Sequence, residues 1–265
     1  MKSRPTLWHI PISHYNEKVR WALDYKGVDA ERRTPVPGMH IPYVLWLTRG
    51  RGYTLPLLEL DGRRYPDSTE AVRALEERYP QPPLYPSDPA ERERALELED
   101  FFDEEVAPYA RRAAFHEMRK DPRWDEIVQR LTPPNPLSRF TRAAGLYGRA
   151  FTAVRYRADA DQKAEEAKEK VTAGFDQLER ELGDHDYLVG DTFTVADLTA
   201  ASLLYPAVLP PEGPFRLDPV PEGWQRFRET LADRPGFAWV EEMFARHRAP
   251  SARSSSERRP QHVAG

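Results

Sequence analysis

The sequence contains no cysteine, and this absence removes several kinds of chemistry at once. Disulfide bridges, zinc sites built on thiolates and a cysteine nucleophile are all excluded. Any reaction at sulfur must therefore use a thiol that a ligand brings to the protein. His9 and His14 lie close together in the sequence, but no third metal ligand accompanies them, so we predict no metal site.

Long hydrophobic runs and an excess of positive charge are also missing. The 265 residues include no stretch near the roughly 20 consecutive apolar residues that a membrane-spanning helix needs. The first residues lack the apolar core of a signal peptide. The formal net charge is −4, whereas a protein that binds nucleic acid needs a basic face. We therefore expect a cytoplasmic protein that binds neither membranes nor nucleic acid.

Short apolar segments alternate with helical patterns over the first 80 residues. The periodicity predicts strands at 6–10, 31–36, 55–60 and 63–65, helices at 15–26 and 67–79, and a partly helical loop at 37–52. The Asp61-Gly62 pair between two strand-like runs predicts a tight hairpin. The order βαβ followed by ββα indicates an α/β domain with a mixed sheet, residues 1–81.

A proline-rich linker, residues 82–89, separates this domain from a region with helical periodicity throughout. The pattern predicts helices at 90–118, 160–182, 194–209 and 235–248. Pro108 is expected to kink the first of them, and the third is the most apolar and therefore the most buried. We predict an all-α domain over 90–248 and a disordered tail over 249–265, which is rich in Ser, Arg and Pro.

Three features of the first domain indicate a ligand site, although each also has an ordinary structural explanation. Pro56 interrupts a strand, so it lies either at a sheet edge or at a cis peptide that turns the main chain of Leu55 outward. Asp67 and Ser68 begin a helix with a capping-box pattern and can also hold the charged end of a peptide-like ligand. Ser13 lies between the first strand and the first helix, where it can cap the helix or donate to a ligand thiolate.

The energy of such a donation decides whether Ser13 matters to a thiol. A hydrogen bond to a charged group contributes about 1.5–3 kcal/mol. One pKa unit corresponds to about 1.4 kcal/mol, so the bond lowers a thiol pKa by roughly 1–2 units. That is enough to ionise much of a small thiol at neutral pH.

The order of these features resembles the cytosolic glutathione transferase superfamily, over roughly residues 6–248. The serine- and cysteine-type pattern S/C-P-F-x-x-R-V-R is similar to Ser13-His14-Tyr15-Asn16-Glu17-Lys18-Val19-Arg20. The family's V-P-x-L and E-S elements are matched by Leu55-Pro56-Leu57-Leu58 and by Asp67-Ser68. Its L-x-G-D-x-x-T-x-A-D element is matched by residues 188–197, in which Thr194 and Asp197 form a structural helix cap.

The resemblance implies a fold, a reaction and roles for single residues. The fold would be a thioredoxin-like N-terminal domain followed by an all-α C-terminal domain, in a homodimer. The reaction would join a thiol, with glutathione as co-substrate, to a hydrophobic electrophile, and Ser13 would be the catalytic residue. Glutathione would be bound by Leu55, Pro56, Asp67 and Ser68, with His40 a further candidate. The pocket for the electrophile would include Tyr15, Tyr109 and Phe115.

Departures from the family pattern leave alternatives open. His14 replaces the expected proline, Asn16-Glu17 is unusual beside it, and residues 49–54 replace the family's N-P pair. These departures are compatible with a non-catalytic binding protein on the same scaffold. Most of the 39 basic residues are arginine, a bias typical of GC-rich bacterial genomes, and some such bacteria use thiols other than glutathione. The absence of an S-S-C run argues against a zeta-type isomerase, and the absence of cysteine against omega-type thiol transfer.

Overall fold

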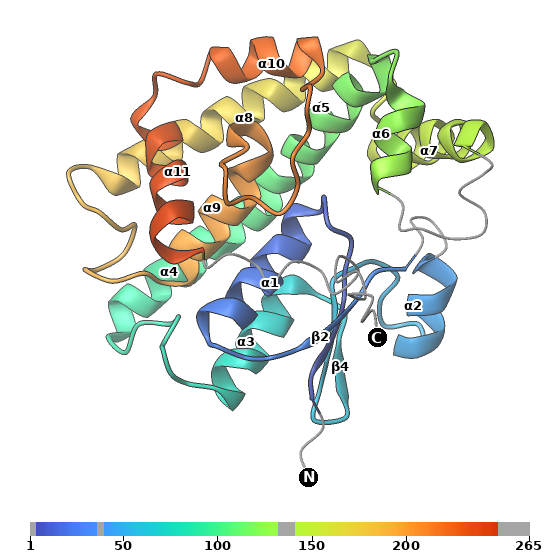
Figure 1. Ribbon diagram of the computed structural model, residues 1–265. Coiled ribbons are helices and arrows are strands. Elements are labelled where there is room, and N and C mark those ends of the chain that lie inside the picture. Colours follow the sequence, from blue (N-terminus) through green and yellow to red (C-terminus); the bar gives the residue numbers. More distant parts are fainter. Residues whose placement is uncertain (1–3, 36–39, 132–140, 249–265) are drawn as a thin grey trace, which may run out of the picture.

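The computed structural model describes residues 4–35, 40–131 and 141–248 (Figure 1). The elements of the N-terminal part are β1 (Thr6–Trp8), α1 (His14–Tyr25), β2 (Glu31–Arg33), α2 (His40–Thr48), β3 (Leu57–Leu60), β4 (Arg63–Tyr65) and α3 (Ser68–Arg78). The four strands form one sheet in the order β2-β1-β3-β4, with β1 parallel to β2 and the other pairs antiparallel. The predicted α/β domain with a mixed sheet is confirmed. Residue 36, where the second strand was expected to end, lies outside the described residues.

Turn residues place these elements as the sequence predicts. Asp61 and Gly62 have φ angles of 48° and 80°, which gives the tight β3–β4 hairpin. Gly27 has a φ of 62° and stands just after α1, where a left-handed residue ends a helix. The Leu55–Pro56 peptide is cis, which is one of the two conformations that the sequence allowed.

The remaining elements are helical. They are α4 (Pro89–Phe101), a π-helical turn η1 (Phe102–Val106), α5 (Ala107–Lys120), α6 (Trp124–Leu131), α7 (Thr141–Tyr156), α8 (Asp161–Leu182), α9 (Val195–Val208), α10 (Glu222–Glu229) and α11 (Pro235–His247). The predicted kink is η1, because Pro108 has no N–H to donate to the carbonyl four residues earlier. The apolar periodicity did not reveal α6, α7 or α10 as separate helices. The predicted tail over 249–265 lies outside the described residues.

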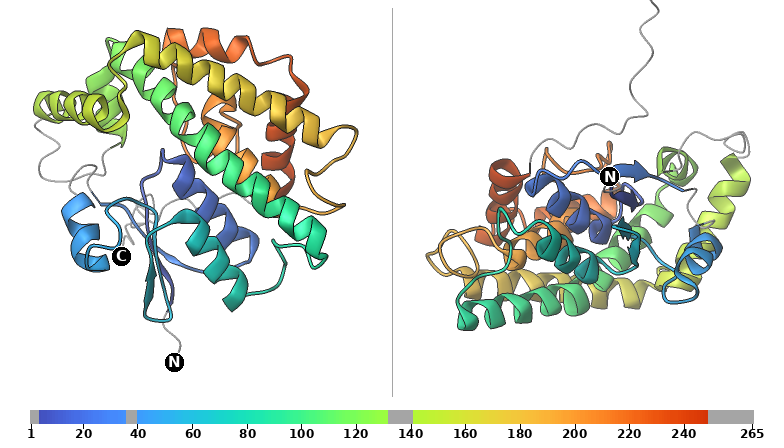
Figure 2. Two further views of the ribbon diagram at one scale, coloured as in Figure 1. Left: turned by 180° about the vertical axis from the view of Figure 1, so that it is seen from behind. Right: turned by 90° about the horizontal axis from the view of Figure 1, so that it is seen from below.

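One hydrophobic core joins the two parts of the chain, as Figures 1 and 2 show for α1 against the helical part. Helix α9 is buried along all of its residues and packs against α1, which confirms the prediction for 194–209. The ring of Trp21 on α1 lies 5.6 Å from that of Phe193 and 4.5 Å from that of Phe244. Leu84, inside the predicted linker, is buried, and its carbonyl accepts a hydrogen bond from Val195 N–H at 2.7 Å. The two domains therefore form a single packed unit.

A capping box fixes the start of α9. The Asp197 carboxylate accepts the main-chain N–H groups of Thr194 and Leu188, each at 2.8 Å, and the Thr194 hydroxyl accepts Ala196 N–H at 3.3 Å. Burial raises the pKa of the Asp197 carboxyl to about 6, although these hydrogen bonds act in the opposite direction. The predicted structural role of Thr194 and Asp197 is confirmed.

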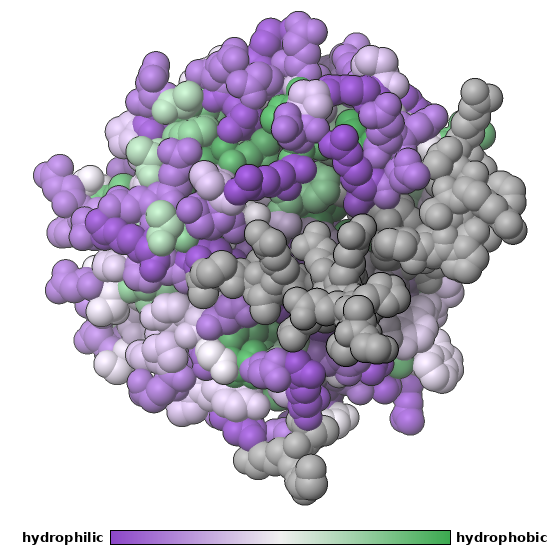
Figure 3. Space-filling view, in the orientation of Figure 1, coloured by the Kyte–Doolittle hydropathy of each residue, from purple (hydrophilic) through white to green (hydrophobic). Residues whose placement is uncertain are grey.

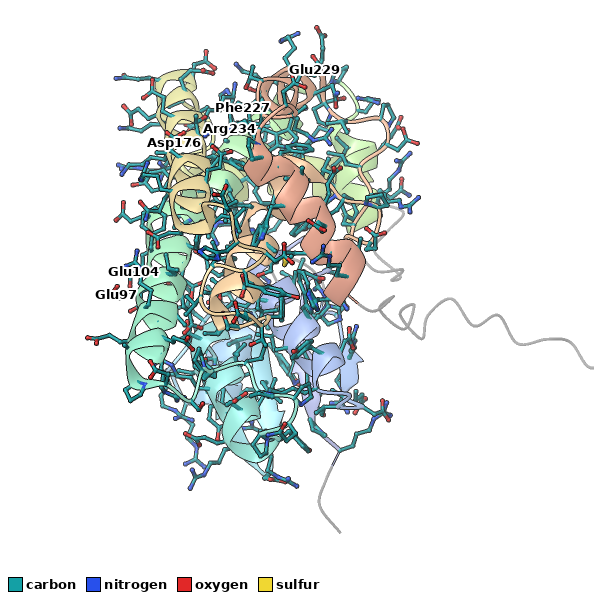
Figure 4. The ribbon with its side chains drawn as sticks, turned by 90° about the vertical axis from the view of Figure 1, so that its left-hand side faces the viewer. Glu97, Glu104, Asp176, Phe227, Glu229 and Arg234 are labelled. Carbon is teal, nitrogen blue, oxygen red and sulfur yellow. The ribbon has the colours of Figure 1, made fainter. Side chains whose placement is uncertain are left out.

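The molecular surface is largely hydrophilic on the face that Figure 3 shows. Among the described residues, the large exposed apolar side chains are confined to α2 with the loop after it and to α7: Leu45, Trp46, Tyr53, Leu146, Tyr147 and Val154. On the side of the molecule away from α2 and α7, Arg234 pairs with Asp176 of α8 (Figure 4). None of the described helices is long and apolar enough to cross a membrane.

Candidate active site at the start of helix α1

Ser13 is the N-cap residue of α1, yet its hydroxyl does not cap the helix. Instead, its Oγ accepts a hydrogen bond from Asn16 Nδ2 at 2.6 Å. Asn16 is buried, and its Oδ1 accepts the N–H of Ile10 at 2.9 Å, which fixes the orientation of the amide. Because the amide N–H₂ group faces Ser13, the single hydroxyl proton of Ser13 must point elsewhere. Half-buried Ser13 therefore keeps a donor for a ligand.

Arg20 holds the loop that carries Ser13. Its guanidinium donates to the carbonyls of Ile10 at 3.2 Å and Pro11 at 2.9 Å, and its Nε lies 2.7 Å from the Glu17 carboxylate. Arg248, at the end of α11, reaches the other oxygen of Glu17 at 2.5 Å. Burial alone would raise the pKa of Glu17, but the two guanidinium groups outweigh it and hold that pKa below its usual value. A buried ion network therefore fixes the loop.

The two histidines near Ser13 are neutral structural groups. Burial, assisted by Arg20, lowers the pKa of His9 to about 2, and burial, assisted by Arg111, lowers that of His14 to about 3. The ring of His14 donates through Nε2 to the carbonyl of Ala107 at 3.0 Å and so ties the first turn of α1 to α5. Within the described ranges, no three metal-binding side chains come together.

The residues expected to bind glutathione lie at the starts of β3 and α3. Asp67 is exposed, and its Oδ1 accepts the N–H groups of Thr69 at 2.8 Å and Glu70 at 3.0 Å. Those two first-turn N–H groups are therefore bonded within the protein and do not face a ligand. Ser68 is buried beside them, and the main chain of Leu55 makes no hydrogen bond to any described residue.

A buried lysine, which sequence reasoning missed, connects α1, α3 and η1 beneath these residues. Lys18 Nζ lies 2.9 Å from Glu99, 2.7 Å from Asp103 and 2.9 Å from the hydroxyl of Thr69. Burial would lower the pKa of Lys18, but the two carboxylates raise it overall, so the lysine is charged. The main-chain carbonyl of Asp103 accepts the hydroxyl of Tyr15 at 2.8 Å. This cluster fixes the helix starts around the candidate site.

Aromatic and cationic side chains gather on the helical side of Ser13. The guanidinium of Arg111, on α5, lies 5.5 Å from the ring centre of Tyr15 and 4.5 Å from that of Tyr156 on α7. Phe115 stacks on Tyr156 at 5.1 Å and packs in the same cluster as Ile12, the residue before Ser13. The structure thus brings Tyr15 and Phe115, two of the three predicted pocket residues, to one side of Ser13.

The comparisons with known proteins match both parts of the chain. The glutathione S-transferase N-terminal domain model matches residues 7–83, and the C-terminal domain model matches residues 143–235. The chain belongs to the glutathione S-transferase superfamily. The predicted superfamily, architecture and enzyme class are confirmed, whereas the roles of single residues in binding and catalysis stay predictions.

The chain resembles a curated protein and many solved structures. It is 28% identical over 238 residues, 88% of this chain and 91% of the relative, to a Caenorhabditis elegans protein named "Probable maleylacetoacetate isomerase". A structure of a bacterial zeta-class maleyl pyruvate isomerase has a TM-score of 0.58 at 22% identity and covers 89% of this chain and 90% of its own. A Methylobacterium radiotolerans glutathione transferase in complex with glutathione sulfonate has a TM-score of 0.55 at 24% identity, covering 89% and 93%. These two structures show the shared fold.

The other predicted site residues, Tyr109 and His40, contact other parts of the protein. The ring of Tyr109 is 5.5 Å from Lys170 on α8 and 5.4 Å from Arg112, so it faces α8. His40 begins α2, where burial, and then the charge of Arg155 on α7, lower its pKa. Tyr156 and Arg155 were missed because α7 was not predicted as a helix. The signal that could have revealed it is the helical periodicity of 141–156, which begins shortly after a proline-rich break.

Proposed function

We propose that this glutathione transferase joins the sulfur of bound glutathione to an electrophilic carbon, with Ser13 stabilising the thiolate. The observation that carries the proposal is the Asn16–Ser13 hydrogen bond, which leaves the hydroxyl proton of Ser13 directed away from the protein amide. Because the chain has no cysteine, the reactive sulfur belongs to the ligand. Ser13 acts on the developing charge and not as a nucleophile.

The peptide part of glutathione would be held by main-chain and carboxylate groups at the starts of β3 and α3. Leu55 offers an unused N–H and C=O to an extended peptide. Asp67 keeps an exposed carboxylate for the ammonium of the γ-glutamyl end, and Ser68 lies beside it. Pro56 supports this bend, and His40 or Arg51 on the α2 side would serve the glycine end.

The chemical step balances without further reagents. The thiol releases its proton to solvent, and the thiolate forms a carbon–sulfur bond. The bond from that carbon to its leaving group breaks, and the leaving group departs with the electron pair. The N-terminus of α1 adds a partial positive charge at the same place, which also favours the thiolate.

Titration of the protein with glutathione in a calorimeter, followed by conjugation of a reactive aryl halide, tests the proposal. We expect binding heat and turnover, and Ser13→Ala is expected to slow conjugation at neutral pH by about tenfold or more. Absence of both heat and turnover would favour the non-catalytic binding protein. Competition among several low-molecular-weight thiols tests whether glutathione is the preferred one.

A second candidate reaction is the glutathione-dependent isomerisation of a maleyl compound. It is favoured by the relative named as a probable maleylacetoacetate isomerase, which matches along 88% of this chain. In such a reaction the thiolate adds to a double bond and leaves again after rotation about the carbon–carbon bond. Loss of maleylacetoacetate absorbance that depends on added glutathione would detect it, and no such change beside rapid aryl conjugation would leave transfer as the reaction.

We also propose a homodimer, which two surfaces of opposite charge support. Five arginines, together with Glu70 and Glu77, line an open cavity of about 770 Å³ between α2, β4 and α3: Arg49, Arg51, Arg63, Arg64 and Arg73. Helix α4 and η1 carry exposed acidic side chains at helical spacing: Glu93, Glu97, Asp100 and Glu104. Figure 4 labels Glu97 and Glu104. Contact between these surfaces in two copies would weaken with added salt, which light scattering at low and high ionic strength measures.

A further inference from the structure

Two guanidinium groups on the helical side of Ser13 have no carboxylate partner among the described residues. Arg111 is half-buried between the rings of Tyr15 and Tyr156, and its Nε is buried without a hydrogen-bond partner. Arg155 lies 5.6 Å from the ring centre of Tyr156 and 5.5 Å from that of Tyr53, in the loop after α2. A line of cations and aromatic rings thus runs from α1 to the exposed loop after α2.

Several arginines of the protein that are withdrawn from water have carboxylate partners that Arg111 lacks among the described residues, whereas Arg119, farther along α5, shares the lack: its Nε and Nη1 are also buried without a hydrogen-bond partner. Arg20 and Arg248 share the carboxylate of Glu17, and Arg234 pairs with both Asp176 and Glu179. A guanidinium withdrawn from water without a counter-charge is costly, because part of its hydration is lost and contact with aromatic rings replaces only some of it. A ligand that supplies an anion to Arg111 would remove that cost.

The positive charge of Arg111 reaches the groups that surround Ser13. Together with burial, which is the larger cause, it lowers the pKa of His14, so this histidine adds no charge of its own. It also acts to lower the pKa of Tyr15, against the stronger effect of burial and the opposing charges of Asp103, Asp67 and Glu104. The Asp103 carboxylate is already bound to Lys18. No acidic side chain of the described residues therefore pairs with Arg111 itself.

We propose that the electrophilic substrate carries a carboxylate on a planar, aromatic or conjugated body, and that Arg111 binds this carboxylate. The proposal rests on the proposed function, because it names the substrate class of the same site. Tyr15, Tyr156 and Phe115 supply flat apolar surface for the body of the substrate. Arg155 lies farther along the same row, where it attracts the anion on its way to Ser13.

This assignment changes the expected pocket from a purely hydrophobic one to a cationic and aromatic one. Arginine suits the task because its planar fork binds a carboxylate with two parallel hydrogen bonds and stacks on rings at the same time. The carboxylates of glutathione itself are a second source of the same chemistry. The KM of both substrates must therefore be measured.

The test compares a chlorodinitrobenzoate with its uncharged methyl ester as acceptors for glutathione. In both, the thiolate forms the thioether and chloride leaves, so only the carboxylate differs. Arg111→Met, which keeps most of the side-chain length, is expected to lower kcat/KM for the benzoate by about tenfold or more, and that for the ester by less than about twofold. Arg111→Lys keeps a positive charge and is expected to restore part of the benzoate activity.

Arg180→Met is the matched control. Arg180 is exposed on α8, one turn after Asp176, which Figure 4 labels on the side that faces the viewer. The Arg180→Met variant loses the same charge at a place far from Ser13, so both acceptors should react with it as they do with the unmodified protein. A loss of benzoate activity in this control as large as in Arg111→Met would overturn the proposal, because net charge alone would then explain the effect.

Three other outcomes overturn the proposal. Equal losses for the benzoate and the ester would mean that Arg111 supports the fold, and thermal unfolding of the variant would show it. A rise in the KM of glutathione with both acceptors would mean that Arg111 binds a carboxylate of glutathione. No change with either acceptor would mean that Arg111 binds no substrate anion.

Failure of the proposed function would look different from failure of this inference. In that case the unmodified protein would conjugate neither acceptor. Calorimetry with an unreactive dinitrobenzoate would still measure anion binding, which should be present in the unmodified protein and in Arg180→Met and at least about tenfold weaker in Arg111→Met. Equal binding by all three proteins would refute the anion site independently of catalysis.

Discussion

Replacing Asn16 by aspartate should reverse the direction of the hydrogen bond at Ser13 while keeping the loop in place. The carboxylate introduced by Asn16→Asp can still accept the N–H of Ile10, as the amide oxygen does now at 2.9 Å. It cannot donate to Ser13 Oγ, so at a donor–acceptor distance near the present 2.6 Å it must accept the serine proton. The hydroxyl would then have no proton to give to the glutathione thiolate.

The size of the effect follows from that single proton. The lost bond to a charged sulfur is worth about 1.5–3 kcal/mol, which at about 1.4 kcal/mol per unit raises the thiol pKa by roughly 1–2 units. The first turn of α1 favours an ionised carboxylate at this position, so repulsion of the thiolate adds to the rise. We therefore expect Asn16→Asp to raise the pKa of bound glutathione at least as much as Ser13→Ala does.

The ultraviolet absorbance of the thiolate, followed against pH with glutathione bound, measures this pKa directly. Asn16→Ala is the comparison variant: it leaves the hydroxyl free but takes the acceptor from Ile10 N–H, so it should lose stability by about 1–3 kcal/mol and change the thiol pKa less. If Asn16→Asp titrates like the unmodified protein, the orientation of the Ser13 proton does not control the thiol and the reasoning is wrong.

Three further predictions concern the support of the site. Glu17→Gln should lower the free energy of unfolding by about 3 kcal/mol at neutral pH. Because the folded-state pKa of Glu17 lies below its usual value of 4.5, this stabilisation is complete well above that value, begins to fall near it and is lost as the pH falls through the folded-state pKa. Urea unfolding at about pH 4 should therefore show a smaller difference between the two proteins, and an equal difference would contradict the ion network. Gly52→Ala should weaken glutathione binding in calorimetry, because a Cβ there would clash with the ring of Pro66 beside Asp67, and unchanged affinity would separate this loop from the site. Asp197→Ala should cost about 3 kcal/mol in thermal or urea unfolding, since two main-chain N–H groups lose their acceptor, while the activity of the remaining folded protein at low temperature should persist.

The sequence was sufficient where one local rule determined the conformation. The Asp61-Gly62 hairpin and the Thr194–Asp197 capping box each depend on a few neighbouring residues, and each was predicted. The apolar character of 194–209 likewise predicted its burial, because a helix that is hydrophobic all round has no face for water.

The site required information that local patterns do not carry. Whether Asn16 caps a helix or orients Ser13 depends on where Ile10 N–H lies after the loop has closed. Arg111 gives no signal in the sequence, because a lone arginine on a helix is ordinary. Arg111 becomes a candidate anion-binding residue only in the folded structure, where no carboxylate of the described residues pairs with it. The charge of Lys18 is explained only by distant carboxylates, such as that of Asp103, 85 residues away in the chain.

The contact between Arg248 and Glu17 joins residues 231 positions apart and bears on the order in which the protein can mature. A ribosome that has made the whole α/β part has produced Ser13, its loop and Arg20, but not Arg248, the second cation that offsets the buried Glu17 carboxylate. Trp21, on the same helix, also donates to the carbonyl of His247. In the nascent N-terminal part, Glu17 therefore has only Arg20 as a partner until nearly the last codon of the described chain has been translated. Truncation of the chain before Arg248 should therefore destabilise the loop that carries Ser13, near the other end of the sequence.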